Sequence, residues 1–144
     1  MICIFCGHET EVTNSRSSRS AASVWRRRRC KACVAQFSTQ ELPDLSKALK
    51  VGSPDGKQPR PFERDKLFVS VHRALLHRSD ALQSATALTA TIMRHILKKQ
   101  RALTASFVVP RGRIARIAIQ ALKRYDPLAA ATYKAYHQAA LKED

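Results

Sequence analysis

Four cysteines stand in two pairs, Cys3-x-x-Cys6 and Cys30-x-x-Cys33, separated by residues 7–29. Each pair can present two thiolates from one tight turn, and two such turns can close a tetrahedral zinc site with Zn–S distances of about 2.3 Å. Because four protein thiolates leave no open coordination position, the predicted zinc ion is structural and supplies folding energy rather than hydrolytic chemistry. The alternatives are two unrelated cysteine pairs or a redox motif of the thioredoxin type.

The residues beside the two pairs are not equivalent. Gly7 follows the first pair and suits a turn that swings around the sulfurs with positive φ. Val34 follows the second pair and lacks that freedom, so we expect the second turn to be slightly irregular. His8 is expected to be an exposed polar residue rather than a ligand, because four thiolates already complete the site.

A run of four arginines, Arg26 to Arg29, directly precedes the second pair. In a strand, the two-residue period places Arg26 and Arg28 on one face and Arg27 and Arg29 on the other. Adjacent guanidinium groups repel one another, whereas they suit bidentate contacts to phosphates or guanine edges. We therefore predict that this run contacts DNA. The alternative is a solvated charged face that offsets the negative charge of a zinc tetrathiolate.

Two further residues near the run have candidate roles. Arg16 lies in the serine-rich segment 15–20, which we expect to be a flexible loop whose cations can follow a nucleic-acid backbone. Trp25 either stacks on a base or covers the small core of the cysteine module, and we favour the core.

Composition limits what the whole chain can be. The chain has 144 residues, with 26 Lys+Arg against 11 Asp+Glu, which gives a formal net charge of +15. A large enzyme is excluded, and the charge favours a polyanionic partner. No stretch approaches about 18 apolar residues and no secretory signal is visible, so we expect a cytoplasmic protein with reduced cysteines and no membrane partner.

The elements that position these residues fall into two modules. Residues 1–42 form the small β cysteine module, residues 45–138 a second module, and residues 139–144 a tail. Weak alternation over 45–51 and the turn Pro54-Asp55-Gly56 indicate a β-hairpin, and a strand-like piece spans 106–109. Apolar spacing indicates four helices, with Asp80 and Asp126 as candidate caps and Pro127 at a first helical position. The predicted fold class is α+β.

Cations in the second module suggest a phosphate ligand. Lys50 and Lys57 on the hairpin and Lys66 in the first turn of a helix can converge on a triphosphate near the helix N-terminus. No glycine-rich phosphate loop, carboxylate pair or Cys, His and acid grouping is visible, so we do not expect an enzyme. The scattered histidines are expected to be surface residues, namely His72, His77, His95 and His137.

The order of these motifs resembles a known family. The first module is similar to the zinc-ribbon half of the NrdR family, bacterial repressors of ribonucleotide reductase genes, and the second to that family's ATP-cone. The ribbon motifs are Cys3-x-x-Cys6-Gly7, Asn14-Ser15-Arg16, Val24-Trp25-Arg26-Arg27-Arg28-Arg29-Cys30-x-x-Cys33 and Phe37-Ser38-Thr39-Gln40-Glu41. The cone motifs are Lys50, Asp55-Gly56, Pro61-Phe62-Glu63-Arg64-Asp65-Lys66-Leu67, Arg73-Ala74-Leu75, Val109-Pro110 before Ile114, and Tyr125-Asp126-Pro127 through Tyr136.

The resemblance implies a zinc-dependent transcriptional repressor in the bacterial cytoplasm, associated with the nucleoid. Its cone would bind ATP or dATP, and its homo-oligomeric state would change with the nucleotide, so that paired ribbons engage repeated sites in double-stranded promoter DNA. By position, Lys50 and Lys66 would lie beside the phosphates and Arg26 to Arg29 would contact DNA. This chain departs from the family at Arg60, usually acidic, and at Arg111, usually a small hydroxyl residue, both expected near the nucleotide.

Two other functions remain open. The first is a zinc-ribbon module that binds RNA or another protein and whose cone has lost its ligand, which Arg60 and Arg111 favour. The second is a detached regulatory piece of a reductase, which the use of all four cysteines for zinc disfavours.

Overall fold

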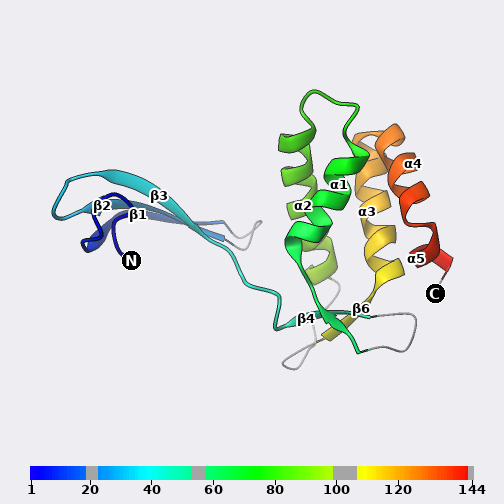
Figure 1. The fold of residues 1–144 in the computed structure, drawn as a ribbon, viewed down its shortest axis with the longest axis horizontal. Helices are drawn as coiled ribbons and strands as arrows, with labels where there is room; N and C mark the ends of the chain where they lie inside the picture. Colours follow the sequence, from blue (N-terminus) through cyan, green and yellow to red (C-terminus); the bar gives the residue numbers. More distant parts are fainter. Residues whose placement is uncertain (19–22, 53–57, 99–106, 143–144) are drawn as a thin grey trace. The chain divides into compact units, whose positions relative to one another are not determined.

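The computed structural model describes residues 1–18, 23–52, 58–98 and 107–142 (Figure 1). The chain divides into two compact units, Met1–Pro43 and Asp44–Asp144. The first consists of strands around the four cysteines, and the second combines a small sheet with helices. The predicted α+β class, a small β unit followed by a mainly helical one, is confirmed.

The first unit is a three-stranded antiparallel sheet in the order β1-β2-β3. Its strands are β1 (Thr10–Ser18), β2 (Ser23–Cys30) and β3 (Gln36–Glu41). The unit buries few side chains, chiefly Cys3, Cys30 and Ser23. Phe5 and Phe37 add one edge-to-face ring contact, with centroids 6.4 Å apart. Because so little apolar surface is buried, a metal bound by the cysteines would be the main source of stability for this unit.

The second unit has its own three-stranded sheet, in the order β5-β4-β6. The hairpin predicted from the sequence is β4 (Leu49–Gly52) paired antiparallel with β5 (Arg60–Pro61). The strand-like piece before Pro110 is β6 (Phe107–Pro110), and it pairs in parallel with β4. The parallel pairing was not predicted, and it buries Leu49 and Val109 completely.

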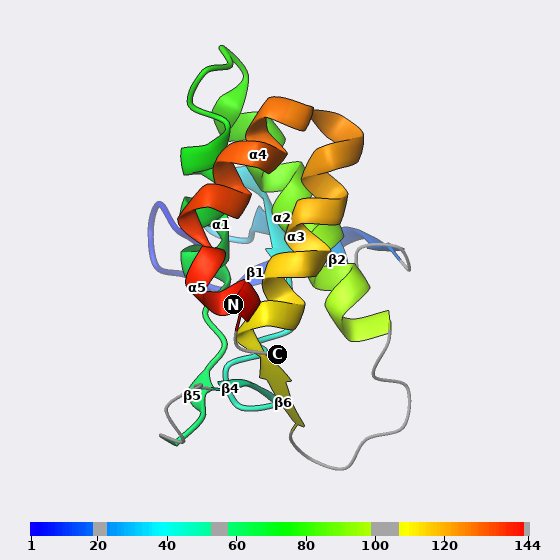
Figure 2. The same ribbon diagram turned by 90° about the vertical axis from the view of Figure 1, so that its right-hand side faces the viewer.

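Helices pack against one another beyond this sheet (Figure 2). They are α1 (Arg64–Ala74), α2 (Ala81–Lys98), α3 (Arg111–Tyr125), α4 (Pro127–Tyr136) and α5 (Gln138–Lys142). Their apolar faces form one core, which includes Val71, Ala85, Ile92, Ala118, Leu122 and Ala129. Residues 138–142 form α5, where we expected a tail from 139, because Ala140 is buried and α5 packs against α3. None of the described helices is long and apolar enough to cross a membrane.

The helix ends are joined by a polar network. Asp126 caps α4 by accepting a hydrogen bond from the Ala129 N–H at 3.0 Å, with Pro127 at the first position, as predicted. Asp80 directly precedes α2, and its carboxylate binds Arg78 at 2.8 Å and the hydroxyl of Ser84 at 2.8 Å. Arg78 also reaches Asp126 at 3.3 Å. This network therefore ties the turn before α2 to the turn before α4.

Candidate functional site

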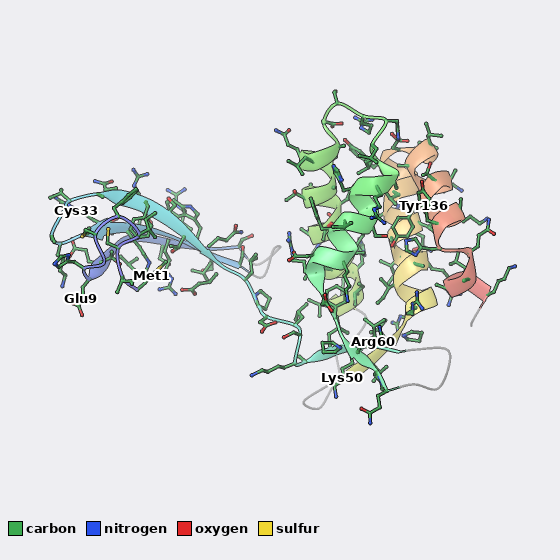
Figure 3. All side chains as sticks on the ribbon, in the orientation of Figure 1. Met1, Glu9, Cys33, Lys50, Arg60 and Tyr136 are labelled. Carbon is green, nitrogen blue, oxygen red and sulfur yellow. The ribbon has the colours of Figure 1, made fainter. Side chains whose placement is uncertain are left out.

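The four cysteine sulfurs lie together at one end of the first unit, where Figure 3 labels Cys33. All four Sγ atoms are within 4.8 Å of one another. The Sγ atoms of Cys3 and Cys33 are 3.7 Å apart, and those of Cys6 and Cys30 are 3.5 Å apart. Sulfurs of a tetrahedral site with 2.3 Å bonds are about 3.8 Å apart, so this donor set fits a zinc ion.

Backbone amides around the cluster favour the thiolate form. The N–H groups of Ala32 and Cys33 each point to the Sγ atom of Cys30 at 3.4 Å. The Cys33 amide is the largest cause that lowers the pKa of Cys30 to about 6, and burial opposes it. The Phe5 amide donates to Cys3 Sγ at 3.5 Å. The His8 amide also favours the thiolate of Cys6, but the neighbouring sulfurs, Cys33 first, and burial outweigh it and raise the pKa of Cys6 to about 12. The thiolate is therefore favoured at Cys30 and not equally at every sulfur.

Both turns after the cysteine pairs adopt the left-handed backbone conformation. Gly7 has a φ of 75°, as its lack of a side chain allows. Val34 has a φ of 59°, so our expectation that the second turn would depart from the first is wrong. A β-branched residue held in this region carries about 1–2 kcal/mol of strain. His8 is exposed, as expected, with Nδ1 3.1 Å from the Cys6 carbonyl oxygen.

The arginine run alternates along β2 as predicted. Arg26 and Arg28 are half-buried and tied to neighbouring strands. Arg26 Nη2 donates to Glu41 at 3.2 Å, and Arg28 donates to Thr39 and Thr10, each at 3.4 Å. These two guanidinium groups therefore already have hydrogen-bond partners within the sheet.

The opposite face of the sheet carries what we call the basic face, formed by Arg16, Trp25, Arg27 and Arg29. Arg16 stands across from Trp25 in the register of β1 and β2, so the expected loop over 15–20 is wrong for residues 15–18, while residues 19 and 20 lie outside the described residues. Arg27 and Arg29 are exposed, and Arg27 donates to Gln36 at 3.2 Å. Trp25 is half-buried here, whereas Phe37 pairs with Arg28 on the other face. The preference for Trp25 as a cover of the small core therefore stays a prediction.

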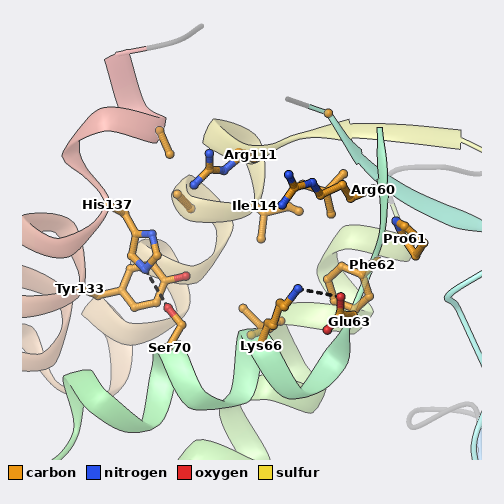
Figure 4. A pocket seen from close by; sticks show the side chains of 15 residues that line it. Arg60, Pro61, Phe62, Glu63, Lys66, Ser70, Arg111, Ile114, Tyr133 and His137 are labelled. Carbon is orange, nitrogen blue, oxygen red and sulfur yellow. Dashed lines mark hydrogen bonds and ion pairs between the residues drawn. The ribbon is translucent and has the colours of Figure 1, made fainter. Parts of the chain in front are cut away.

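A pocket of about 400 Å³ lies in the second unit, between the small sheet and the helices (Figure 4). Three cationic side chains line it, namely Arg60 of β5, Lys66 of α1 and Arg111 of α3. Lys66 Nζ donates to Glu63 at 2.7 Å. The lining is Val51, Gly52, Arg60, Pro61, Phe62, Glu63, Lys66, Leu67, Ser70, Arg111, Ile114, Ala115, Tyr133, His137 and Ala140.

Comparisons with known proteins cover both units. A family model described as "Transcriptional repressor NrdR-like, N-terminal domain" matches residues 1–41. A protein of Gluconobacter oxydans named Transcriptional repressor NrdR is 35% identical over 130 residues, with 90% of this chain and 74% of that relative covered. A protein of the same name from Maricaulis maris is 31% identical over 143 residues, with 96% and 84% covered. The chain belongs to the NrdR family.

Membership of the NrdR family confirms the resemblance seen in the sequence. The NrdR relatives are named as transcriptional repressors. The NrdR ribbon match spans all four cysteines, so the family and the sulfur geometry both support a structural zinc ion. Arg16 and Arg26 to Arg29 also fall within the matched residues.

The structure places the predicted phosphate-side lysines of this NrdR chain differently from one another. Lys66 lines the pocket. Lys50 is exposed on β4 and is not among the pocket-lining residues, because strand alternation turns it away from the buried Leu49. Lys57 lies outside the described residues. Arg60 and Arg111, the two departures from the NrdR pattern, both line the pocket.

The polar end of the pocket was not predicted from the sequence. His137 Nε2 is 2.7 Å from Ser70 Oγ, and its ring stacks on Tyr133 at 4.2 Å. Burial, with a smaller effect from Arg111, lowers the pKa of His137. His137 is thus half-buried, contrary to the expected surface position. Helical spacing in the sequence could have indicated this end of the pocket, because Ser70 is four residues after Lys66 and lies on the same face of the helix.

Another histidine lies at the surface, as expected, and has a carboxylate partner. His77 is exposed, and its Nε2 is 2.9 Å from Asp126 Oδ2. This contact joins the turn after α1 to the cap of α4. We assign it to the stability of the helical unit rather than to ligand binding, because neither residue lines the pocket.

Proposed function

We propose that this member of the NrdR family is a nucleotide-responsive repressor of ribonucleotide reductase genes. Its zinc ribbon binds double-stranded promoter DNA, and its helical unit binds ATP or dATP. The observation that carries the nucleotide half of the proposal is the convergence of Arg60, Lys66 and Arg111 on one pocket. A second polyanion-binding surface, separate from the ribbon, suits a protein that binds two different ligands, DNA and a nucleotide.

The DNA contacts belong to the basic face. Arg27 and Arg29 are exposed and stand on a strand whose end is fixed by the sulfur cluster through Cys30. Exposed guanidinium groups of this kind can bind phosphates and, in the major groove, guanine edges. Arg16 extends the charge along β1, and Trp25 offers an apolar surface between the cations. Arg26 and Arg28 stabilise the sheet that presents this face.

The nucleotide would lie with its phosphates among the three cations. Lys66 is in the first turn of α1, where the partial positive charge of the helix N-terminus adds to its own. Arg60 and Arg111 supply planar donors that suit phosphate oxygens. In this proposal the two arginines take the part that the sequence assigned to Lys50. The polar end of the pocket, with Tyr133 and His137, then faces the nucleoside.

Self-association connects the two sites. A nucleotide that binds one oligomer more tightly than another shifts the population toward it. DNA affinity follows if one oligomer spaces its ribbons to match repeated promoter sites. Zinc is required throughout because it holds the ribbon in its folded form.

The DNA half is tested with the full-length, zinc-loaded chain and fluorescent duplexes. One duplex carries a ribonucleotide reductase promoter from the same genome, and the other is a scrambled sequence of equal length. We expect the promoter to bind at least about 1,000-fold more tightly at physiological salt. Equal affinity for the two duplexes would contradict the proposed repressor role.

The nucleotide half is tested separately, by calorimetry with ATP and dATP. We expect saturable binding of at least one of them. Absence of heat with both nucleotides, in a chain that still binds the promoter, would instead favour a ribbon module whose cone has lost its ligand.

A further inference from the structure

The outer face of α1 carries a stripe of exposed side chains. Asp65, Val69 and Arg73 are spaced by four residues, so they lie on one side of the helix. All three are exposed, with Val69 at 44%. The opposite side of α1 is buried against α2 and α4 (Figure 2). We call Asp65, Val69 and Arg73 the α1 stripe.

Among the described residues, the charged side chains of the α1 stripe have no close partners. Asp65 approaches one cation, Arg64, at 3.9 Å, which is too long for a hydrogen bond. Arg73 has no ion pair among the described residues. The other described carboxylates of this unit are occupied: Asp44 by the Ser46 amide, Glu63 by Lys66, and Asp80 and Asp126 by Arg78.

The stripe is self-complementary. Its acid and its base lie at equal distances, about 6 Å along the helix, on either side of Val69. A two-fold axis through Val69 would therefore bring Asp65 of one copy to Arg73 of the other, and the reverse. Most surfaces of a chain with a net charge of +15 repel a second copy. The α1 stripe has one charge of each sign, so it allows close approach.

We propose that the α1 stripe pairs with the α1 stripe of a second copy of this chain, antiparallel across a two-fold axis at Val69. The proposal rests on the self-association included in the proposed function, and it names the surface. Helices packed in this way lie about 8–10 Å apart, within reach of an Asp and Arg side-chain pair.

Apolar side chains next to the stripe would be covered by the second copy. A groove between α1 and α4 is lined by Val69, Leu76 and Tyr136. Leu76 is 65% exposed and Tyr136 is 70% exposed, and Figure 3 shows Tyr136 at the surface of the helical unit. Burial of these side chains supplies the non-directional part of the association, while the charges fix its register.

The same groove adjoins the nucleotide pocket. Glu63, Lys66, Ser70 and His137 line both. A triphosphate that draws Lys66 away from Glu63 leaves a free carboxylate at the edge of the groove. Occupancy of the pocket thereby changes the charge that a second copy meets, which gives a physical route from nucleotide to oligomer.

The test uses charge reversal in the full-length, zinc-loaded chain, with sedimentation velocity in the absence and presence of ATP. Asp65→Arg and Arg73→Asp each place like charges opposite one another twice in the pair. We expect each variant to raise the dissociation constant of self-association at least about tenfold. Lys123→Asp, an exposed charge reversal at the end of α3, should leave it unchanged.

The decisive experiment mixes the two charge-reversed variants, Asp65→Arg and Arg73→Asp. One copy then carries two arginines and the other two aspartates, so both contacts become attractive again. We expect the mixture to associate as a mixed pair with near wild-type affinity, and a tag on one variant identifies that pair. Any cost to the helix itself is present in both single variants, so recovery on mixing cannot arise from folding.

The possible outcomes distinguish failure of the proposed α1 pairing from failure of the proposed function. Single variants that associate like the wild type, or a mixture that stays as weak as they are, would overturn the α1 pairing while wild-type self-association stands. A wild type that stays monomeric with and without ATP would overturn both the pairing and the self-association. Promoter and nucleotide binding are measured independently of either result.

Discussion

Lys66 donates a hydrogen bond to Glu63 at 2.7 Å, at the edge of a pocket whose other cations are Arg60 and Arg111. The side chains of Lys66 and Glu63 are 71% and 52% exposed. A surface ion pair of this kind contributes only about 0–1 kcal/mol, so a phosphate can displace Glu63 with little loss. The pair keeps Lys66 close to the place where a phosphate would bind.

Replacing Lys66 by alanine should weaken ATP and dATP binding about tenfold or more, because a charge-assisted contact to phosphate is lost. Calorimetry on the full-length chain measures the effect. Lys123→Ala, on the exposed end of α3, is the matched control. Zinc content should stay the same in both variants. Unchanged nucleotide affinity in Lys66→Ala would place the phosphates elsewhere.

The two faces of the arginine run should respond differently to mutation. Arg27→Ala with Arg29→Ala removes two exposed cations, so we expect weaker promoter binding and a salt slope that is shallower by about 2. Ribbon stability should be nearly unchanged, since Arg27 has only the Gln36 contact. Fluorescence anisotropy over a salt series provides the slope, and an identical slope would show that this face does not contact phosphates.

Arg26→Ala with Arg28→Ala is the matched pair on the other face. Arg26 and Arg28 donate hydrogen bonds to Glu41, Thr39 and Thr10. Replacing the two arginines should therefore lower the stability of the ribbon. Their effect on the salt slope should be smaller than that of the exposed pair. The ease with which a chelator removes zinc from each double variant reports the stability difference.

Val34→Gly should stabilise the ribbon by about 1 kcal/mol, because glycine adopts the left-handed conformation without strain. Val34 is 54% exposed, so little apolar burial is lost. In competition with a chelator, the variant should lose zinc more slowly, or to a smaller extent, than the wild type. Ala32→Gly, in the same turn without a positive φ, should have the opposite effect. Loss of stability in Val34→Gly would mean that the turn is not strained.

The ribbon could be predicted closely because its signals are local. The cysteine spacing and the alternation of the arginines depend only on neighbouring residues. Val34 is the exception, because a left-handed valine is imposed by closure of the site around the sulfurs and not by its own preference.

The pocket of the helical unit was harder to foresee. It is assembled from β4, β5, α1, α3, α4 and α5, and the parallel pairing of β4 with β6 joins segments far apart in the chain. No local pattern specifies such a pairing. Lys66 was predicted from its place in a helix turn, Arg60 and Arg111 were recognised through a family comparison, and His137 was missed because its burial depends on contacts with α1.

The network around Asp126 predicts a pH dependence of stability. The Ala129 amide, followed by His77 and Arg78, lowers the pKa of Asp126 to about 2. A carboxyl whose folded pKa is depressed stabilises the fold above its ordinary value of about 3.9, and that stabilisation is lost as the pH falls toward the folded pKa.

Asp126→Asn should therefore lower the melting temperature of the helical unit by several degrees at pH 7. The gap between wild type and variant should close as the pH falls from about 4 to about 2. Helical circular dichroism follows this unit apart from the ribbon, which loses zinc in acid as its thiolates are protonated. A gap that stays constant across this range would contradict the role given to the ionised carboxylate.

The most direct test of the central claim is promoter binding at fixed salt with no nucleotide, with ATP and with dATP, while light scattering follows the mass of the protein. Promoter affinity should differ between nucleotide states, the mass should change with it, and Lys66→Ala should remove the difference. Identical promoter affinity and identical mass in all three states would contradict the central claim.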